Sequence, residues 1–155
     1  MTLSGTLLYE AHFDLADPIA VGPTPEGYRA INCITGGTFK GERLSGTFLS
    51  QGGADWVKIR ADGSIAVDVR ACAQTDDGAL IYITYLGRIV IPPEIQAAVL
   101  DTSAADRPDP SQYYFRVAPL FETASEKYAC LNHICAVGVG SIVPGGVEYR
   151  VYAVD

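Results

Sequence analysis

Hydrophobic and polar residues alternate along most of this 155-residue chain with the two-residue period of β-strands. In residues 6–13 the apolar side chains fall on one face, and Glu10 and His12 fall on the other. Residues 65–75 show the same alternation, whereas the spacing of an amphipathic helix is scarce. The pattern therefore predicts an all-β protein whose strands each turn one face toward a core.

Glycine, proline and aspartate divide the chain into segments of strand length. Asp62-Gly63 is the strongest hairpin signal, and Asp76-Asp77-Gly78 is a second one. Residues 17–27 hold three prolines and two glycines and predict a loop, while Pro92-Pro93 predicts a short helix that ends near Leu100. Strands are expected over residues 6–13, 28–39, 46–51, 55–60, 65–75, 79–91, 113–117, 127–139 and 147–154.

The expected fold is an antiparallel barrel of eight to ten strands with one short helix, built as a single domain over residues 1–155. Several short strands divided by turns fit a sandwich or a barrel. Gly36-Gly37 lies inside a predicted strand and is suited to the bend at a barrel corner. Many strands also carry apolar residues on both faces, which favours the barrel.

Composition and charge exclude several classes of function. Hydrophobic residues make up 48% and charged residues 19%, which excludes intrinsic disorder. The net charge is −7, so binding to nucleic acid or to an anionic membrane surface is not expected. No apolar run reaches the roughly 18 residues of a membrane span, and the first ten residues lack the features of a signal peptide. We therefore expect a cytoplasmic protein, and the sequence leaves open whether it forms a homodimer.

The cysteines and the known cofactor motifs point away from metals and nucleotides. Cysteines stand at positions 33, 72, 130 and 135 without the spacing of a zinc site, and we expect buried free thiols. Neither a phosphate-binding glycine loop that opens a helix nor a serine nucleophile elbow occurs. No cofactor or metal is expected, so any catalysis falls to Asp, Glu, Arg and Tyr side chains.

Two charged groups are the first candidates for chemistry. Asp68 and Arg70 lie two residues apart and share one face of a predicted strand. If that face lines the barrel, the pair lies in a low-dielectric cavity, where perturbed charges are candidate functional groups. The alternative is that this face is hydrated and the valines of the other face form the core. Asp55 follows Gly52-Gly53 and is a second candidate, as a catalytic carboxylate at the mouth of the cavity.

Aromatic and polar residues on the other strands are candidates for binding a ligand. Trp56 is the only tryptophan, and the chain has nine tyrosines, which can line a pocket or donate a hydrogen bond to a developing oxyanion. The alternative is that these aromatic residues are ordinary members of strands and core. The candidate ligand-binding residues are Trp56, Tyr82, Arg116, Tyr128 and Asn132.

The order of several short motifs resembles one known family. These motifs are GGTFKGERLSG (36–46), GGADW (52–56), DVR (68–70), TDDGALIYI (75–83), YYFRVAPLFET (113–123), YACLN (128–132) and VEYRVYAV (147–154). Together they resemble the bacterial and fungal family catalogued as domain of unknown function 3237. The resemblance implies a lipocalin-like, calycin-type barrel with an internal pocket, and its motif positions include Asp55, Asp68 and Arg70. The sequence departs from the family pattern at Cys130, where a larger aromatic residue is expected.

These observations lead to a functional hypothesis. We expect a cofactor-independent acid/base enzyme of the isomerase, cyclase or lyase type, acting in the barrel on a small aromatic or polyketide-like molecule of secondary metabolism or aromatic catabolism. Asp68 or Asp55 would act as base or acid, and Arg70 and Arg116 would stabilise negative charge. The alternatives are a non-enzymatic carrier or sensor of a small apolar ligand and a structural module with a filled barrel.

Overall fold

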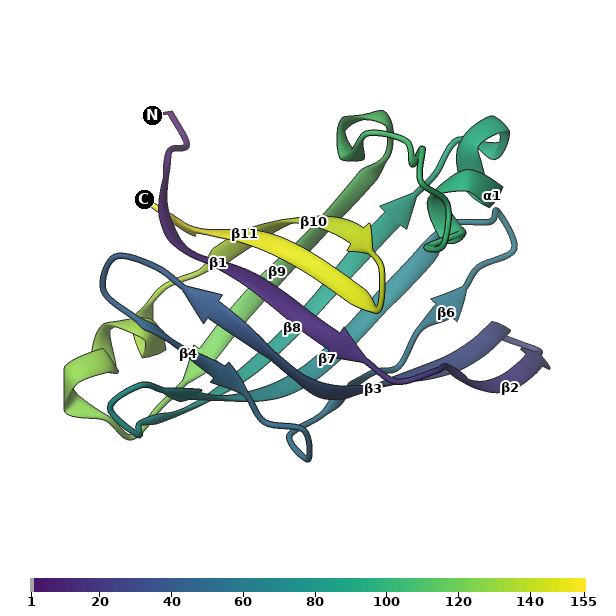
Figure 1. The fold of residues 1–155 in the computed structure, drawn as a ribbon. Helices are drawn as coiled ribbons and strands as arrows, with labels where there is room; N and C mark the ends of the chain where they lie inside the picture. The colour runs from purple at the N-terminus through teal and green to yellow at the C-terminus, as the bar shows by residue number, and fades with distance from the viewer. Residues whose placement is uncertain (1) are drawn as a thin grey trace.

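The computed structural model describes residues 2–155 and is built almost entirely of antiparallel strands (Figure 1). One α-helix and two short 3-10 helices connect strands within the described residues: α1 (Pro93–Leu100), η1 (Pro110–Gln112) and η2 (Glu126–His133). The strands are β1 (Gly5–Leu15), β2 (Ile19–Thr24), β3 (Gly27–Lys40), β4 (Ser45–Phe48), β5 (Ala54–Asp55), β6 (Lys58–Ile59), β7 (Ile65–Thr75), β8 (Leu80–Val90), β9 (Tyr114–Glu122), β10 (Ala136–Val143) and β11 (Gly146–Val154).

The strands close into a barrel because β1 pairs with both β11 and β3. The sheet runs in the order β1-β11-β10-β9-β8-β7-β4-β3, and the short strands β5 and β6 share the position of β4 between β7 and β3. This arrangement makes eight positions around the barrel, while β2 extends the sheet beyond β3 (Figure 1). The predicted all-β barrel is therefore confirmed.

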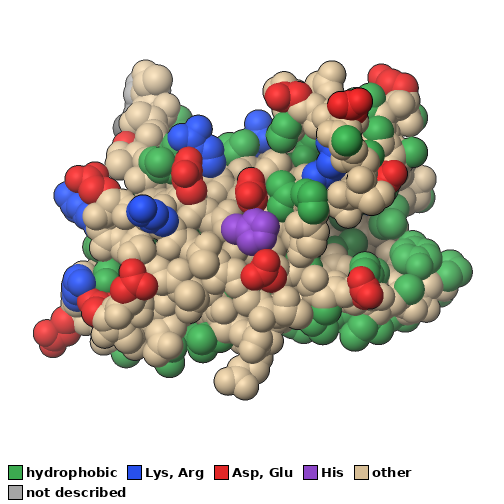
Figure 2. All heavy atoms as spheres, viewed as in Figure 1, with side chains coloured by type: hydrophobic (Ala, Val, Ile, Leu, Met, Phe, Trp, Pro, Cys, Tyr) green, Lys and Arg blue, Asp and Glu red, His purple; other side chains and the backbone are tan. Residues whose placement is uncertain are grey.

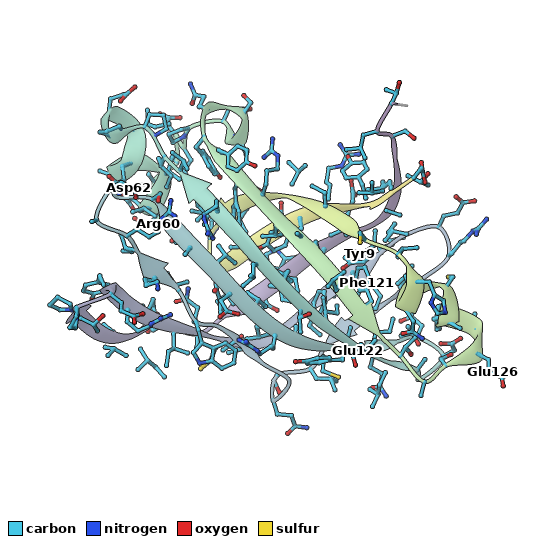
Figure 3. The ribbon with its side chains drawn as sticks, turned by 180° about the vertical axis from the view of Figure 1, so that it is seen from behind. Tyr9, Arg60, Asp62, Phe121, Glu122 and Glu126 are labelled. Atoms are coloured by element: carbon cyan, nitrogen blue, oxygen red, sulfur yellow. The ribbon has the colours of Figure 1, made fainter. Side chains whose placement is uncertain are left out.

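The interior is packed at one end and hollow at the other. At the packed end, the ring of Tyr9 lies 5.7 Å from Phe39 and 6.3 Å from Phe121 between ring centres. Leu131 of η2 is buried there, and the remaining void has a volume of only about 10 Å³. Figure 3 shows Tyr9 and Phe121 together inside the barrel toward η2. Helix α1 lies at the opposite end (Figure 1), where its last residue, Leu100, lines a cavity.

Two glycines allow neighbouring segments of the barrel to approach closely. Gly37 has a φ of +129°, and a side chain there would meet the backbone carbonyl of His12 on β1. Gly53 precedes β5, and a side chain there would meet the carbonyl oxygen of Arg70 on β7. The predicted glycine bend in the third strand thus corresponds to the seam between β1 and β3, at the centre of Figure 1.

Local predictions met with mixed outcomes. The helix after Pro92-Pro93 and the hairpin at Asp62-Gly63 are confirmed, the latter by the bond from the Gly63 N–H to the carbonyl of Arg60 at 2.9 Å. The loop predicted over residues 17–27 is wrong in part, because β2 forms there as an edge strand, where proline is tolerated.

The strand predicted over residues 127–139 is also wrong in its first half. Residues 126–133 form η2, and β10 begins only at Ala136. Tyr128 and Leu131 are three residues apart and both buried, as the three-residue turn of a 3-10 helix requires.

The four cysteines are free, as expected, but none is fully buried: Cys33 and Cys72 are half-buried, and Cys130 and Cys135 are exposed, which corrects the expectation of buried thiols. Their segment lies on the outside of the barrel end rather than within a buried strand. In residues 2–155, no helix is both long enough and apolar enough to cross a membrane.

Candidate functional site

A cavity of about 400 Å³ occupies the open end of the barrel. Apolar side chains from the barrel strands make up most of its wall, among them Phe13, Ile34 and Phe115. The rim consists of residues 15–18 and the turn between β10 and β11, together with the end of α1. Figure 2 shows a hollow in the surface on this side of the molecule, below the loop that follows α1. The volume falls within the range of small-molecule sites.

A row of inward-facing residues crosses one wall of this cavity. Asp55 on β5 lies opposite Asn32 on β3 and opposite Val69 on β7, and Val69 lies opposite Tyr85 on β8. Residues directly opposite one another on paired strands project to the same side of the sheet. Asn32, Asp55, Val69 and Tyr85 all line the cavity, so pairing across four strands brings a carboxyl group, an amide and a phenol onto one surface.

The Asp55 carboxyl group is anchored on one side and free on the other. Its Oδ1 accepts a hydrogen bond from the backbone N–H of Asp68 at 3.0 Å. Among residues 2–155, no hydrogen-bond donor reaches Oδ2. Burial raises the pKa of Asp55 from 3.8 to about 6, and the nearby negative charge of Asp68 adds to the rise, although the hydrogen bond opposes it. A carboxyl group with this pKa can accept and release a proton near neutrality.

Two buried phenols face the same cavity. The ring of Tyr149 on β11 lies 5.7 Å from Tyr85 and 5.3 Å from Phe115, both in edge-to-face contact. Burial raises the pKa of both tyrosines well above its usual range, and the charge of Asp55 contributes to the rise in each. Both hydroxyl groups therefore remain protonated under ordinary conditions and can donate hydrogen bonds to a ligand.

The structure places the predicted charged pair outside the barrel. Arg70 binds Asp68 at 2.8 Å on the outer face of β7, and their side chains are 49% and 38% exposed. The alternating residues Val67 and Val69 fill the inner face instead. Our expectation that this ion pair lies in the cavity is therefore wrong, because the face with the larger apolar side chains is the one that becomes buried.

Trp56 lies on the same outer surface. The guanidinium carbon of Arg70 lies 5.2 Å from the centre of the indole ring, so the two side chains stack against each other. Trp56 does not line the cavity, although it follows Asp55 directly. The expected contact of Trp56 with a ligand in the cavity is thus not supported, since consecutive residues of a strand project to opposite sides.

The other four predicted ligand-binding residues also lie away from the cavity. Tyr82 is on the outer face of β8, and Arg116 stacks on Tyr114 on the outer face of β9 at 5.2 Å. Tyr128 and Asn132 belong to η2, which closes the far end. The Tyr128 hydroxyl donates to Asp77, and the Asn132 amide bonds to the backbone of Thr123. Of the eight predicted site residues, all of which the structure describes, Asp55 is the one that lines the cavity.

Sequence reasoning missed the roles of Asn32, Tyr85 and Tyr149. A weak signal for Tyr85 is present, since the odd-numbered residues of β8 include three isoleucines and no charged residue, whereas the even-numbered residues mix apolar residues with Thr84 and Arg88. That parity assigns Tyr85 to the buried face. Tyr149 similarly shares its face with Val147 and Val151. No comparable signal exists for Asn32, because its place depends on pairing with a strand of two residues.

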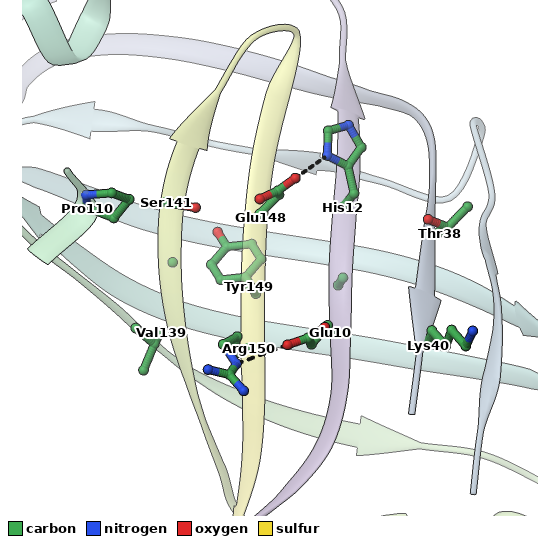
Figure 4. Close-up of a pocket in the computed structure, with 12 residues that line it drawn as sticks. Glu10, His12, Thr38, Lys40, Pro110, Val139, Ser141, Glu148, Tyr149 and Arg150 are labelled. Carbon is green, nitrogen blue, oxygen red and sulfur yellow. Dashed lines mark hydrogen bonds and ion pairs between the residues drawn. The ribbon is translucent and has the colours of Figure 1, made fainter. Parts of the chain in front are cut away.

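A second depression lies on the outer surface over β1, β10 and β11 (Figure 4). Four of its side chains bind in pairs: His12 contacts Glu148 at 3.3 Å, and Arg150 contacts Glu10 at 3.1 Å, while Lys40 also lines the depression. These groups are more than one-third exposed, and ion pairs of this kind contribute little energy. The barrel cavity, with its buried carboxyl group and phenols, is therefore the stronger candidate.

The sequence was compared with known families and proteins. It matches the family described as "Protein of unknown function (DUF3237)" over residues 4–154. The chain belongs to this family. A UPF0311 protein of Clostridium acetobutylicum is 36% identical over 140 residues, which cover 89% of this chain and 85% of that protein. The crystal structure of a conserved protein of unknown function from Rhodopseudomonas palustris superposes with a TM-score of 0.92 at 30% identity, covering 100% of this chain and 99% of that one.

One relative has a named activity. The hydroalkoxylation enzyme phnH of Penicillium herquei is 32% identical over 110 residues, which cover 71% of this chain and 56% of that protein. The crystal structure of an enzyme from Penicillium herquei also matches, with a TM-score of 0.74 and 25% identity over 100% of this chain and 96% of that one. The chain is therefore similar both to proteins of unknown function and to a protein named as a hydroalkoxylation enzyme.

Proposed function

We propose that this protein is a cofactor-independent acid/base enzyme that adds a hydroxyl group across a carbon–carbon double bond within one small aromatic molecule, closing a ring. The observation that carries the proposal is the convergence of one buried carboxyl group, Asp55, with two neutral phenols, Tyr85 and Tyr149, in an otherwise apolar cavity. The similarity to a hydroalkoxylation enzyme favours this reaction class over isomerisation or elimination.

The proposed reaction needs one proton acceptor that later becomes a proton donor. Asp55 takes the proton from the hydroxyl group of the substrate, and the oxygen forms its bond to one carbon of the double bond. The electron pair of the double bond moves to the neighbouring carbon or to a conjugated carbonyl oxygen. Asp55 then returns the same proton to the neighbouring carbon. The net change is the addition of O–H across C=C with no external reactant. A pKa of about 6 suits both steps near neutral pH.

The two phenols would stabilise the negative charge that develops during the reaction. Tyr85 and Tyr149 remain protonated and can donate hydrogen bonds to the oxygen on which negative charge develops. Their rings are fixed by edge-to-face contacts with each other and with Phe115, so little reorganisation is needed during the reaction. The apolar wall excludes water and positions the two ends of the substrate. In this proposal, the barrel holds its substrate as lipocalin-like barrels hold their ligands.

A direct test uses 2′-hydroxychalcone, an aromatic molecule that closes to flavanone by this addition. Loss of the chalcone absorbance measures the rate, and the enantiomeric excess of the flavanone separates enzymatic closure from the racemic background. We expect an enantiomeric excess from the wild-type protein and a racemic product with Asp55→Asn. Saturable binding of the chalcone without any closure would contradict the enzyme proposal and support the alternative of a carrier or sensor.

A further inference from the structure

The charge of the cavity defines which ligands can enter it. Among residues 2–155, no Lys, Arg or His side chain lines the cavity, whereas Asp17 does so at the rim and Asp55 at the wall. The remaining polar groups that line it are Asn32, Thr102 and the two phenols. An anionic ligand would therefore meet two carboxyl groups and no cation.

Two cations near this end of the barrel, Arg60 and Arg107, lie outside the cavity. Arg107, in the loop after α1, donates from Nη2 to the carbonyl of Val99 at 2.9 Å; its buried Nε has no hydrogen-bond partner among the described residues, but the side chain does not line the cavity. Arg60 bonds to Ser64 at 2.8 Å and lies 3.5 Å from Asp62 (Figure 3). Neither of these side chains provides a counter-ion for a ligand inside the barrel.

Acidic residues around the entrance of the cavity also disfavour anionic ligands. Figure 2 shows acidic side chains on both sides of the hollow, and the loop after α1 contributes Asp101, Asp106 and Asp109. The whole chain carries a net charge of −7, so an approaching anion is repelled before it reaches the rim. Inside, Asn32 and the two phenols can donate hydrogen bonds to a carboxylate or phosphate, but no lining residue in the described part of the chain supplies a positive charge, and a buried charge without a counter-ion is costly.

We propose that the cavity selects an uncharged hydroxylated aromatic molecule and excludes carboxylate, phosphate and sulfate compounds. This inference rests on the function proposed above and names its substrate class. It follows that the substrate arrives free rather than attached to a phosphate-bearing thioester carrier. The reaction that supplies it must already have released the molecule from any such carrier, by hydrolysis or by release with ring closure, and must have left no ionised acid on it.

The test compares two probes of matched shape, 2-naphthol and 2-naphthoate, by titration calorimetry at pH 7.5. Naphthol is uncharged at this pH and naphthoate is an anion. We expect naphthol to bind at least about tenfold more tightly, a difference of about 1.4 kcal/mol. The preference should shrink in Asp55→Asn and at pH 5, where Asp55 is mostly protonated. The matched control Asp77→Asn removes a carboxylate at the far end of the barrel and should leave the preference unchanged.

Each outcome of the titration bears on the inference. Naphthoate that binds as tightly as naphthol, or a preference that Asp55→Asn leaves intact, would overturn it. Absence of binding by both probes at millimolar concentration would overturn the cavity as a ligand site. The failure of the catalytic proposal has a different signature: naphthol is still preferred, but 2′-hydroxychalcone binds without closing.

Discussion

Replacement of Asp55 by asparagine is expected to abolish catalysis and, at the same time, to stabilise the fold at neutral pH. The folded protein holds the pKa of this carboxyl group at about 6 against an ordinary value of 3.8. Each pKa unit corresponds to about 1.36 kcal/mol, so ionised Asp55 costs the folded state about 3 kcal/mol. Asparagine keeps a carbonyl oxygen that can accept the N–H of Asp68, and it carries no charge.

The stability gained by Asp55→Asn is expected to increase with pH. Because the folded-state pKa is raised, the contribution of Asp55 to stability is fully present below pH 3.8 and is lost as pH rises through about 6. The advantage of Asp55→Asn should therefore be small at pH 4 and reach its full size above pH 7. For a chain of this length, a gain of about 3 kcal/mol raises Tm by roughly 6–12 °C.

The assay is thermal or urea unfolding of both proteins between pH 4 and pH 8. Asp77→Asn is the matched control of opposite sign, since its hydrogen bonds with Lys127, Thr75 and Tyr128 lower the pKa of Asp77 to about 2. That variant should lose stability at neutral pH, and its deficit should fade as the pH falls toward about 2. An Asp55→Asn protein that is less stable than wild type at pH 7.5, or whose advantage is the same at pH 4, would refute the reasoning.

Further predictions follow from the neighbours of Asp55. Tyr149→Phe removes one hydrogen-bond donor and should lower kcat/KM for chalcone closure by about 10²-fold, with probe binding within tenfold of wild type in calorimetry. Arg70→Gln leaves Asp68 without its cation, so the pKa of Asp55 should rise, and the acidic midpoint of the pH–rate profile should move upward with it. Gly140→Ala would place a Cβ 2.8 Å from the rings of Phe115 and Tyr149, and urea unfolding should show a loss of about 1–3 kcal/mol.

Much of the fold could be predicted because alternation is a local signal. The alternation over residues 65–75 places Asp68 and Arg70 on one face and the valines on the other, and the structure confirms both sets. Which face turns inward depends on the total apolar volume across the barrel rather than on this strand alone. Of the two alternatives for this strand, the hydrated charged face is the one the structure shows, because burying the ion pair would cost more than leaving it exposed.

The candidate site was harder to predict because it is assembled by pairing between distant segments. Asp55 meets Asn32 and Val69 through β5, a strand of two residues with no readable period of its own. Tyr149 reaches the same cavity from the last strand of the chain. The sequence identifies Asp55 as a candidate by its glycine neighbours, but the register that surrounds it with phenols is a property of the closed barrel.

The barrel wall is interrupted between the two-residue strands β5 and β6. This interruption explains how the Asp55 carboxyl group can be fixed in position and still be free to react. In a regular ladder, a backbone carbonyl would accept the N–H of Asp68; here the side chain of Asp55 accepts it, and the carbonyl of Trp56 binds Arg29 at 2.7 Å instead. The wall thus fixes Oδ1 and leaves Oδ2 for a ligand. Burial without a cation then keeps the proton affinity of Asp55 high. Because the ionised group destabilises the folded protein, selection for stability alone would not retain it. The break between β5 and β6 therefore fixes the position of the Asp55 carboxyl group, whereas burial raises its proton affinity against the opposing effect of the hydrogen bond from Asp68.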